Sequence, residues 1–144
     1  MNEQYPQLQL DNQLCFPLYA ASKEIVRLYK PLLDPLDLTY TQYITMMVLW
    51  EQRETTVKEL GEILWLDSGT LTPVLKKLES KGYLNRRRSE KDERSVILTV
   101  TPQGDALQAQ AARIPLQVGS CVPLTAEEAR QLHILLHKVL EGLR

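Results

Sequence analysis

Apolar residues recur every three or four positions over most of the chain, which predicts a mainly helical protein. The first such run covers residues 11–33, where Pro31 and Pro35 close it. Pro17 lies early in this run and is expected to kink or delay the first turn. Thr125 with Glu128 forms a capping-box pattern that opens the last run. This run has an apolar stripe, made of Leu132, Leu135, Leu136, Val139, Leu140 and Leu143. Long amphipathic helices are therefore expected at both ends of the chain.

Capping signals divide the centre of the chain into three shorter helices. Capping-box patterns, in which a threonine precedes a glutamine or glutamate by three residues, open two of them at Thr39 and Thr56. The third follows a cap at Asp67 or Ser68 and ends at Gly82. The inward positions are predicted to be Val57, Leu60, Ile63 and Leu64 in the second helix and Leu71, Val74, Leu75 and Leu78 in the third.

A β-hairpin is predicted after these helices. A basic run at residues 84–89 and a β-branched run at residues 95–100 form its strands, and the polar turn EKDE joins them. Thr101 and Pro102 then begin another helix, which is expected to break near Pro115. A loop is expected next, and its residues include Gly119, Cys121 and Pro123.

These elements predict a mainly α protein with a small β-hairpin wing, that is, a winged helix-turn-helix. The DNA-binding part would span about residues 39–101 within a single domain of residues 1–144. The terminal helices, at about residues 11–33 and 102–144, have apolar stripes with little to bury against in so small a module. Two copies are therefore expected to form an intertwined homodimer through these helices. The alternative is a monomer that folds both helices onto its own core.

Basic side chains crowd the third central helix and the hairpin. Between Lys76 and Arg94 there are eight basic and four acidic residues, a local balance of +4 in a chain of net charge −1. A helix joined to a charged hairpin can place one element in a DNA major groove and the other in the neighbouring minor groove. The expected partner is double-stranded DNA. The alternatives are a solvated charged surface and a protein-binding winged helix, which would not need this basic excess.

The predicted DNA contacts lie on the outward side of the helix and on the hairpin. Small residues and hydroxyls near the start of the helix allow a close approach to base edges, and the later lysines can reach phosphates or guanine. Asp92 is expected to hold Arg94 extended, so that Arg94 enters a narrow minor groove. The predicted DNA-binding residues are Ser68, Thr70, Thr72, Lys76, Lys77, Arg86, Arg88, Asp92 and Arg94.

The sequence argues against several other classes of function. No apolar run approaches the roughly 18 residues of a membrane span, and the polar amino terminus does not resemble a signal peptide, so a cytoplasmic location is expected. No phosphate-binding glycine loop, nucleophile elbow or HExxH motif is present, which argues against an enzyme. His133 and His137 lie four residues apart without a third ligand nearby, so no metal or cofactor is expected.

The segments DNQLCFPLYAASKEI, YKPLLDPLDLTYTQY and DSGTLTPVLKKLE…KGYLNRRRSEKDERSVILTVTPQG resemble the MarR-type winged-helix transcription regulators. More narrowly, they resemble the organic-hydroperoxide-sensing, OhrR-type branch, and the D-x-R-S run at residues 92–95 is similar to the family's wing signature. Pro17 departs from the pattern, which has another residue after the CF pair. The resemblance covers nearly the whole chain. It implies a homodimer that binds a pseudo-palindromic operator and represses a hydroperoxide-detoxifying gene, with organic hydroperoxide as the inducer.

Cys15 is the residue most closely connected with this resemblance. A lone cysteine on an apolar helix face is most often a small buried hydrophobe, and two cysteines are too few for a disulfide framework. Tyr19, however, lies one turn beyond Cys15 on the same face. Tyr29 lies within about 40° of that face but about 21 Å along the helix axis. Tyr29 could therefore meet Cys15 only if a second copy of the helix packed antiparallel to the first.

The resemblance gives these residues a redox role. In the similar regulators, tyrosines matching Tyr29 and Tyr40 reach the reactive cysteine from the partner subunit. The sensor-supporting residues would be Phe16, Tyr19, Tyr29 and Tyr40. The resemblance implies that Cys15 is oxidised and that Cys121 then forms an intersubunit disulfide with it, and a small thiol that caps Cys15 is the alternative to Cys121. The alternatives to a redox sensor are a repressor released by a phenolic or lipophilic ligand and a thiol peroxidase.

Overall fold

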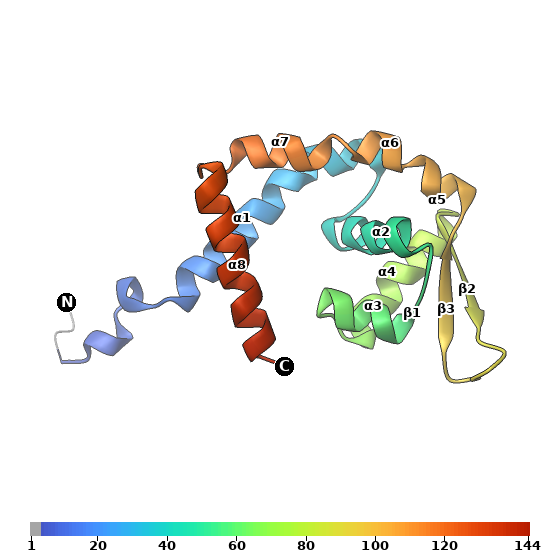
Figure 1. Cartoon of the computed structure of the whole chain (residues 1–144), viewed down its shortest axis with the longest axis horizontal. Coiled ribbons are helices and arrows are strands. Elements are labelled where there is room, and N and C mark those ends of the chain that lie inside the picture. Colours follow the sequence, from blue (N-terminus) through green and yellow to red (C-terminus); the bar gives the residue numbers. More distant parts are fainter. Residues whose placement is uncertain (1–3) are drawn as a thin grey trace.

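The computed structural model describes residues 4–144, so the first three residues of the polar amino-terminal stretch lie outside it. A head formed by residues 40–100 lies at one side, and an arm formed by the helices before and after it extends away (Figure 1). The helices of the head are α2 (Tyr40–Gln52), α3 (Val57–Leu64) and α4 (Ser68–Ser80). Those of the arm are α1 (Cys15–Leu33), α5 (Pro102–Ala106), α6 (Gln108–Ala111), α7 (Ile114–Cys121) and α8 (Ala126–Gly142). Short 3-10 turns cover Pro6–Leu8, Leu10–Asn12 and Asp34–Leu36.

The head contains a three-stranded antiparallel sheet in the order β1 (Glu54–Thr56), β3 (Val96–Val100), β2 (Leu84–Arg88). β2 and β3 are the strands of the predicted hairpin. The sequence does not predict β1, because three residues are too few to show an alternating pattern. Its Thr55 pairs with Leu98 of β3, which ties the segment between α2 and α3 to the wing. The expected fold class, mainly helical with a winged helix-turn-helix, is confirmed.

The three helices and the sheet enclose the core of the head. α2, α3, α4, β2 and β3 each contribute leucines that are at most 2% exposed, namely Leu49, Leu60, Leu71, Leu75, Leu78, Leu84 and Leu98. The predicted inward side of α4 is confirmed at its three leucines, with Val74 half-buried. In α3, Leu60 is buried as expected, but Ile63 is 44% exposed. The prediction for Ile63 is therefore wrong, because its side chain remains partly open to solvent in the described chain.

Side-chain caps determine where the helices begin. At Thr39, Thr56 and Thr125 the threonine hydroxyl accepts the N–H of the third helical residue, whose side chain accepts the threonine N–H in return. The Asp67 carboxylate accepts the Thr70 N–H at 2.7 Å, so Asp67 rather than Ser68 caps α4. The three capping boxes predicted from the sequence are all confirmed.

α1 begins at Cys15 rather than Asp11, because two 3-10 turns occupy the residues before it. Pro17 is the third residue of α1, where a missing N–H costs no helical hydrogen bond. The helix passes through Pro31 and ends at Leu33. Of the two prolines predicted to close the run, Pro31 is therefore inside the helix and only Pro35 follows it.

The segment after the wing is a series of short helices rather than one helix that breaks at a proline. α5, α6 and α7 follow one another closely, and Pro115 lies in the first turn of α7. The loop predicted around Gly119 and Cys121 is wrong, because both residues belong to α7 and Cys121 is its last residue. α7 packs along α1. The packing of α7 against α1 offsets the cost of about 1 kcal/mol that Gly119 imposes as a glycine inside a helix.

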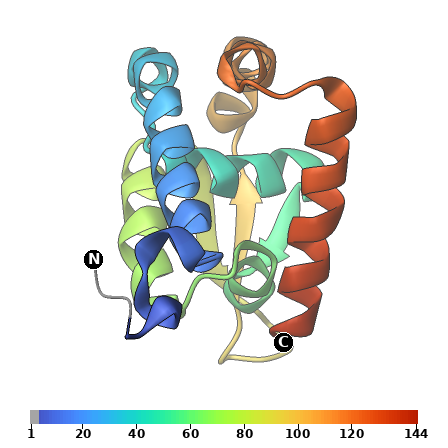
Figure 2. The same cartoon turned by 90° about the vertical axis from the view of Figure 1, so that its left-hand side faces the viewer.

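α1 and α8 run along opposite sides of the molecule in opposite chain directions (Figure 2). The end of α8 touches the head, where the Arg144 guanidinium lies 4.4 Å from the centroid of the Trp65 ring. Of the nineteen large apolar side chains that are exposed within residues 4–144, sixteen belong to the arm and the residues before it. Four of them are members of the predicted stripe, namely Leu132, Leu135 and Val139 of α8 and Leu143 directly after it. Within residues 4–144, no helix is both long and apolar enough to cross a membrane.

Candidate nucleic-acid interface and thiol sites

One side of α4 faces solvent and carries five of the residues predicted to contact DNA. Ser68, Thr70, Thr72, Lys76 and Lys77 are all exposed, because the leucines of the other side are packed in the head. The Thr72 hydroxyl donates to the Ser68 carbonyl at 2.7 Å, which ties it to the helix backbone. Hydrogen bonds from Thr70 lower the pKa of the capping Asp67 carboxyl. The helix thus presents short polar side chains near its start and two lysines further along.

The three consecutive arginines of β2 have different neighbours. The Arg86 guanidinium pairs with Glu79 of α4 at 3.0 Å, which lowers the pKa of the Glu79 carboxyl. Arg87 pairs with Glu54 of β1 at 3.4 Å. Arg88 donates to the Glu93 carbonyl at 3.1 Å, within the wing turn. Arg86 is half-buried, and its ion pair with Glu79 holds the wing against α4. Arg86 could contact DNA only from this paired position.

Asp92 was expected to hold the side chain of Arg94, but in the structure it binds the backbone of the wing turn instead. The Asp92 carboxylate accepts the backbone N–H of Arg94 at 3.0 Å, and the Asp92 carbonyl accepts the N–H of Ser95 at 2.9 Å. Among residues 4–144 the Arg94 guanidinium forms no ion pair. Asp92 therefore fixes the backbone from which Arg94 extends, rather than holding the guanidinium itself.

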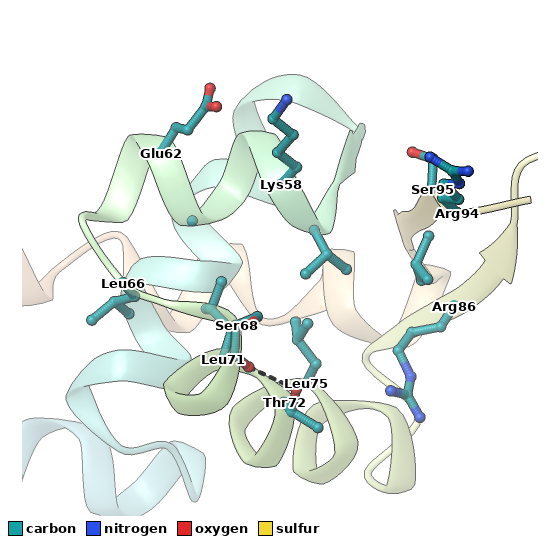
Figure 3. A pocket seen from close by; sticks show the side chains of 13 residues that line it. Lys58, Glu62, Leu66, Ser68, Leu71, Thr72, Leu75, Arg86, Arg94 and Ser95 are labelled. Atoms are coloured by element: carbon teal, nitrogen blue, oxygen red, sulfur yellow. Dashed lines mark hydrogen bonds between the residues drawn. The ribbon is translucent and has the colours of Figure 1, made fainter. Parts of the chain in front are cut away.

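A cleft of about 570 Å³ opens between α3, α4 and the wing (Figure 3). Apolar side chains that include Leu71 and Leu75 line its floor. Its polar lining residues are Lys58 and Glu62 of α3, Ser68 and Thr72 of α4, and Arg86, Arg94 and Ser95 of the wing. Sequence reasoning missed Lys58 and Ser95. A single lysine in a short helix that also contains Glu59 and Glu62 has the pattern of an ordinary solvated surface.

One cysteine lies at the amino-terminal end of a helix and the other at the carboxyl-terminal end of a different helix. Cys15 is the first residue of α1 and Cys121 is the last residue of α7, and both are exposed free thiols. A helix favours negative charge near its amino-terminal end and disfavours it near its carboxyl-terminal end. The two thiols therefore lie in opposite electrostatic environments. The neighbours of Cys15 are open to solvent in the single chain, with Phe16 43% and Tyr19 63% exposed.

A cluster of tyrosines lies at the other end of α1. The ring centroids of Tyr29 and Tyr40 are 4.9 Å apart, and the ring of Tyr43 lies 5.7 Å from Tyr29 and 6.3 Å from Tyr40. Burial raises the pKa of all three phenols. Tyr29 and Tyr40 were predicted to act together, whereas Tyr43 was missed. Cys15 begins the same helix fourteen residues earlier, a rise of about 21 Å, so it cannot reach the tyrosine cluster of its own chain.

An apolar cleft of about 270 Å³ adjoins this cluster, between α1 and the start of α2. Tyr29 and Tyr40 line it together with Val26, Leu33 and Leu38, and the charged residues Arg27, Lys30 and Asp34 also contribute to the lining. Aliphatic and phenolic walls suit the hydrocarbon part of a small organic molecule better than a small polar one such as hydrogen peroxide.

The two histidines of α8 contact each other, as their spacing predicts. Their ring centroids are 4.2 Å apart, and a ring nitrogen of His137 lies 2.9 Å from the His133 carbonyl. The described residues contain no group of three or more His, Cys, Asp or Glu side chains that could hold a metal ion.

The fold and the basic exterior of α4 and the wing define a winged-helix regulator of transcription that binds DNA. A family model described as transcriptional regulator SarA/Rot matches residues 27–110. The organic hydroperoxide resistance transcriptional regulator of Bacillus subtilis (strain 168) is 46% identical over 143 residues, which cover 99% of this chain and 97% of the relative. The chain belongs to the MarR family of winged-helix regulators, in the organic-hydroperoxide-sensing, OhrR-type branch.

Structures of AbfR, a protein of Staphylococcus epidermidis, are similar over almost the whole chain. Reduced AbfR bound to DNA is 34% identical with a TM-score of 0.79, and covers 100% of both chains. Overoxidised AbfR bound to DNA is 34% identical with a TM-score of 0.78, over 98% of this chain and 99% of the other. Disulfide-formed AbfR is 35% identical with a TM-score of only 0.67, over 99% of this chain and 97% of the other. These relatives are regulators rather than enzymes, as the sequence predicts.

Proposed function

We propose that this chain is a homodimeric repressor that leaves its operator when an organic hydroperoxide oxidises Cys15. The observation that carries the proposal is the distribution of the sensor parts along α1, with the exposed thiol at its first residue and the tyrosine cluster near its end. An antiparallel pair of α1 helices in a dimer would bring each Cys15 to the Tyr29 and Tyr40 of its partner. The apolar cleft beside those tyrosines would then accept the hydrocarbon part of the peroxide.

The proposed chemistry has two steps. In the first, the Cys15 thiolate attacks the terminal oxygen of ROOH, the O–O bond breaks, and the sulfur keeps the OH group as sulfenic acid. The leaving alkoxide takes one proton from water and becomes ROH. In the second, the thiol of the partner subunit's Cys121 attacks that sulfur, an intersubunit disulfide forms, and water leaves. The sulfur pair loses two electrons in total and the peroxide gains them.

The disulfide, rather than oxidation of Cys15 alone, is proposed as the step that releases DNA. This chain resembles AbfR less in its disulfide form, with a TM-score of 0.67, than in its reduced and overoxidised DNA-bound forms, at 0.79 and 0.78. In AbfR an oxidised form can thus still be found on DNA, and the disulfide accompanies a different shape. Cys121 joins α7 to the loop before α8, so a bond to it would pull on the helices of the arm that carry the two heads.

The DNA contacts remain those proposed from the sequence, on α4 and the wing. The exposed side of α4 would enter the major groove with Ser68, Thr70, Thr72, Lys76 and Lys77, and the wing would offer Arg88 and Arg94 to the adjacent minor groove. Arg86 and Asp92 would support the wing by the ion pair to Glu79 and by the turn backbone. Residues 39–101 would form the DNA-binding part and the helices on either side the dimer.

The test uses a duplex that the reduced protein selects from a random-sequence pool, bound at fixed ionic strength and followed by fluorescence anisotropy. Wild-type protein, Cys15→Ser and Cys121→Ser are each titrated with cumene hydroperoxide. Wild type is expected to release the duplex and to run as a disulfide-linked dimer on a non-reducing gel. Cys15→Ser is expected to stay bound, and Cys121→Ser to be oxidised at Cys15 yet to stay bound when no small thiol is present.

Two outcomes would contradict the proposal. Release of Cys15→Ser by the peroxide would remove Cys15 from the mechanism. Release of Cys121→Ser without any added thiol would show that the disulfide is not needed. Release of Cys121→Ser only after a small thiol is added would show that a mixed disulfide at Cys15 can substitute for the bond to Cys121, with Cys15 still the sensor.

A second function is favoured by one observation, the 270 Å³ cleft beside Tyr29 and Tyr40. A phenolic or lipophilic ligand that binds there could release DNA without any change at sulfur. Release of Cys15→Ser by such a compound, under anaerobic conditions and with no peroxide, would support this function over redox sensing.

A further inference from the structure

The cleft between α3, α4 and the wing lies where a single DNA strand has to pass. A major groove and the adjacent minor groove are separated by one sugar-phosphate backbone. A protein that places a helix in one groove and a wing in the other must therefore let that backbone cross between them. In this chain the space between the recognition helix and the wing is the 570 Å³ cleft of Figure 3.

We propose that this cleft is a seat for a backbone phosphate and that Lys58 of α3 is its principal cation. Lys58 belongs to neither of the two elements that would enter the grooves. It lines the cleft from the third side, together with Ser95 and Arg94 of the wing turn. The ligand is the phosphodiester itself, so the contact fixes how deeply α4 and the wing enter their grooves and carries no information about base sequence.

The charges around the cleft support an anionic occupant. Among residues 4–144 neither Lys58 nor the Arg94 guanidinium forms an ion pair. Arg86, the third cation that lines the cleft, is already paired with Glu79 at 3.0 Å. Two uncommitted cations thus remain against a single lining carboxylate, Glu62.

The position of Glu62 narrows the site within the cleft. In Figure 3 Lys58 lies between Glu62 on one side and Arg94 and Ser95 on the other. A phosphate would be repelled from the Glu62 side and attracted to the wing side. There the Ser95 hydroxyl can donate a hydrogen bond, and the four-carbon stem of Lys58 is long enough to adjust its ammonium to the phosphate oxygens. The seat is therefore assigned to the Lys58–Ser95 side of the cleft.

The salt dependence of DNA binding measures this contact. Each phosphate neutralised by a lysine contributes about −0.9 to the slope of log K against log salt. Lys58→Gln would remove one such contact from each half of a dimer. The slope should become shallower by about two, so that between 50 and 200 mM salt the variant loses about tenfold less affinity than wild type. The loss of affinity at low salt should be similar for the selected duplex and for an unrelated one.

Lys138→Gln on α8 is the matched control, because it removes the same charge from a helix of the arm. Lys58→Arg should keep the slope of wild type. Phosphate-ethylation interference on the selected duplex shows which DNA phosphate Lys58 contacts. With Lys58→Gln, interference should disappear at one phosphate in each half-site, between the major-groove and minor-groove contacts, and stay elsewhere.

Three outcomes would overturn the proposal. One is that the slope of log K against log salt is the same for Lys58→Gln as for Lys138→Gln. Another is a loss confined to the selected duplex, which would mean that Lys58 contacts a base. The third is an unchanged interference pattern. Thermal unfolding of the variants distinguishes a lost contact from a damaged head, since Lys58 is exposed and its replacement should leave the melting temperature unchanged. None of these measurements depends on peroxide or on the cysteines.

Discussion

Gly104 should be the glycine of this chain that least tolerates a methyl group. It lies in the first turn of α5, where the wing joins the arm. A Cβ built there would lie 2.1 Å from the Tyr83 carbonyl oxygen and 3.1 Å from the Met46 Cε. Real Cβ atoms do not approach a carbonyl oxygen within 3.0 Å, so the backbone would have to move by about 1 Å or more.

That movement would disturb three hydrogen bonds at the joint. The Tyr83 carbonyl accepts the Thr101 N–H at 3.1 Å, and the Gly104 N–H donates to the Thr101 hydroxyl at 3.0 Å. The Gly104 carbonyl accepts the Trp50 indole N–H at 3.0 Å. At about 1 kcal/mol for each bond, Gly104→Ala should lower the free energy of unfolding by about 2 to 4 kcal/mol, in the range of severe single substitutions.

Gly142→Ala is the matched control. Gly142 is the last residue of α8, and within residues 4–144 its added Cβ would meet no heavy atom within 4 Å apart from its chain neighbours and the nearby backbone of its own helix. Alanine has a higher helix propensity than glycine, by up to about 1 kcal/mol, so this variant should be neutral or slightly more stable. Urea unfolding followed by far-ultraviolet circular dichroism, at one protein concentration, measures both. A Gly104→Ala protein within about 0.5 kcal/mol of wild type would refute the reasoning.

Two further predictions concern carboxylates of the DNA-binding head. Glu79→Gln should leave Arg86 half-buried without its counter-charge and lower stability by at most about 1 kcal/mol, and Glu51→Gln, at an exposed end of α2, is its control in the same urea assay. Asp67 has a lowered pKa in the folded chain, so the stability that its charge adds is complete above the ordinary value of 3.8 and is lost as the pH falls through the lower folded value. Asp67→Asn keeps a capping side chain without the charge. Its deficit relative to wild type should therefore be present at pH 7 and shrink towards pH 3, and a deficit that stays constant over this range would contradict the assignment.

Local signals in the sequence predicted most of the helices, because each depends on a few neighbouring residues. The three capping boxes and the inward leucines of α4 are of this kind. β1 could not be predicted, since its strand identity comes from pairing with β3, more than forty residues later in the chain. The loop expected at Cys121 was wrong for a similar reason. Gly119 suggests a loop locally, but packing of α7 against α1 keeps the segment helical.

The candidate sites show the same division between local and distant information. The exposed polar side of α4 follows from helical periodicity alone, and the structure places its residues as expected. The pairing of Arg86 with Glu79 depends on how the wing folds back onto α4, which no local pattern encodes. Lys58 becomes a candidate only when α3 is seen to border the same cleft as the wing. Tyr43 joins Tyr29 through the packing of α2 on α1.

The apolar stripe of α8 provides a direct test of the dimer on which the sensor depends. Leu135 and Ile134 are neighbours on this helix and are similarly exposed in the single chain, at 58% and 53%. At about 100° per residue, however, Leu135 belongs to the stripe with Leu132 and Val139, whereas Ile134 points about 170° away from the centre of that stripe. If the stripe is the surface that a second copy covers, an aspartate should be tolerated at Ile134 and not at Leu135.

The size of the effect follows from burial. Covering a leucine contributes about 1.5 to 3 kcal/mol, and a buried unpaired carboxylate costs at least as much again. A symmetric dimer contains the substitution twice, so Leu135→Asp should weaken association by about 6 kcal/mol or more, at least about 10⁴-fold in the dissociation constant. Sedimentation velocity at micromolar concentration should show a monomer for Leu135→Asp and a dimer for Ile134→Asp. A dimeric Leu135→Asp protein, or equal dissociation of the two variants, would mean that the stripe of α8 is not the surface that a second copy covers.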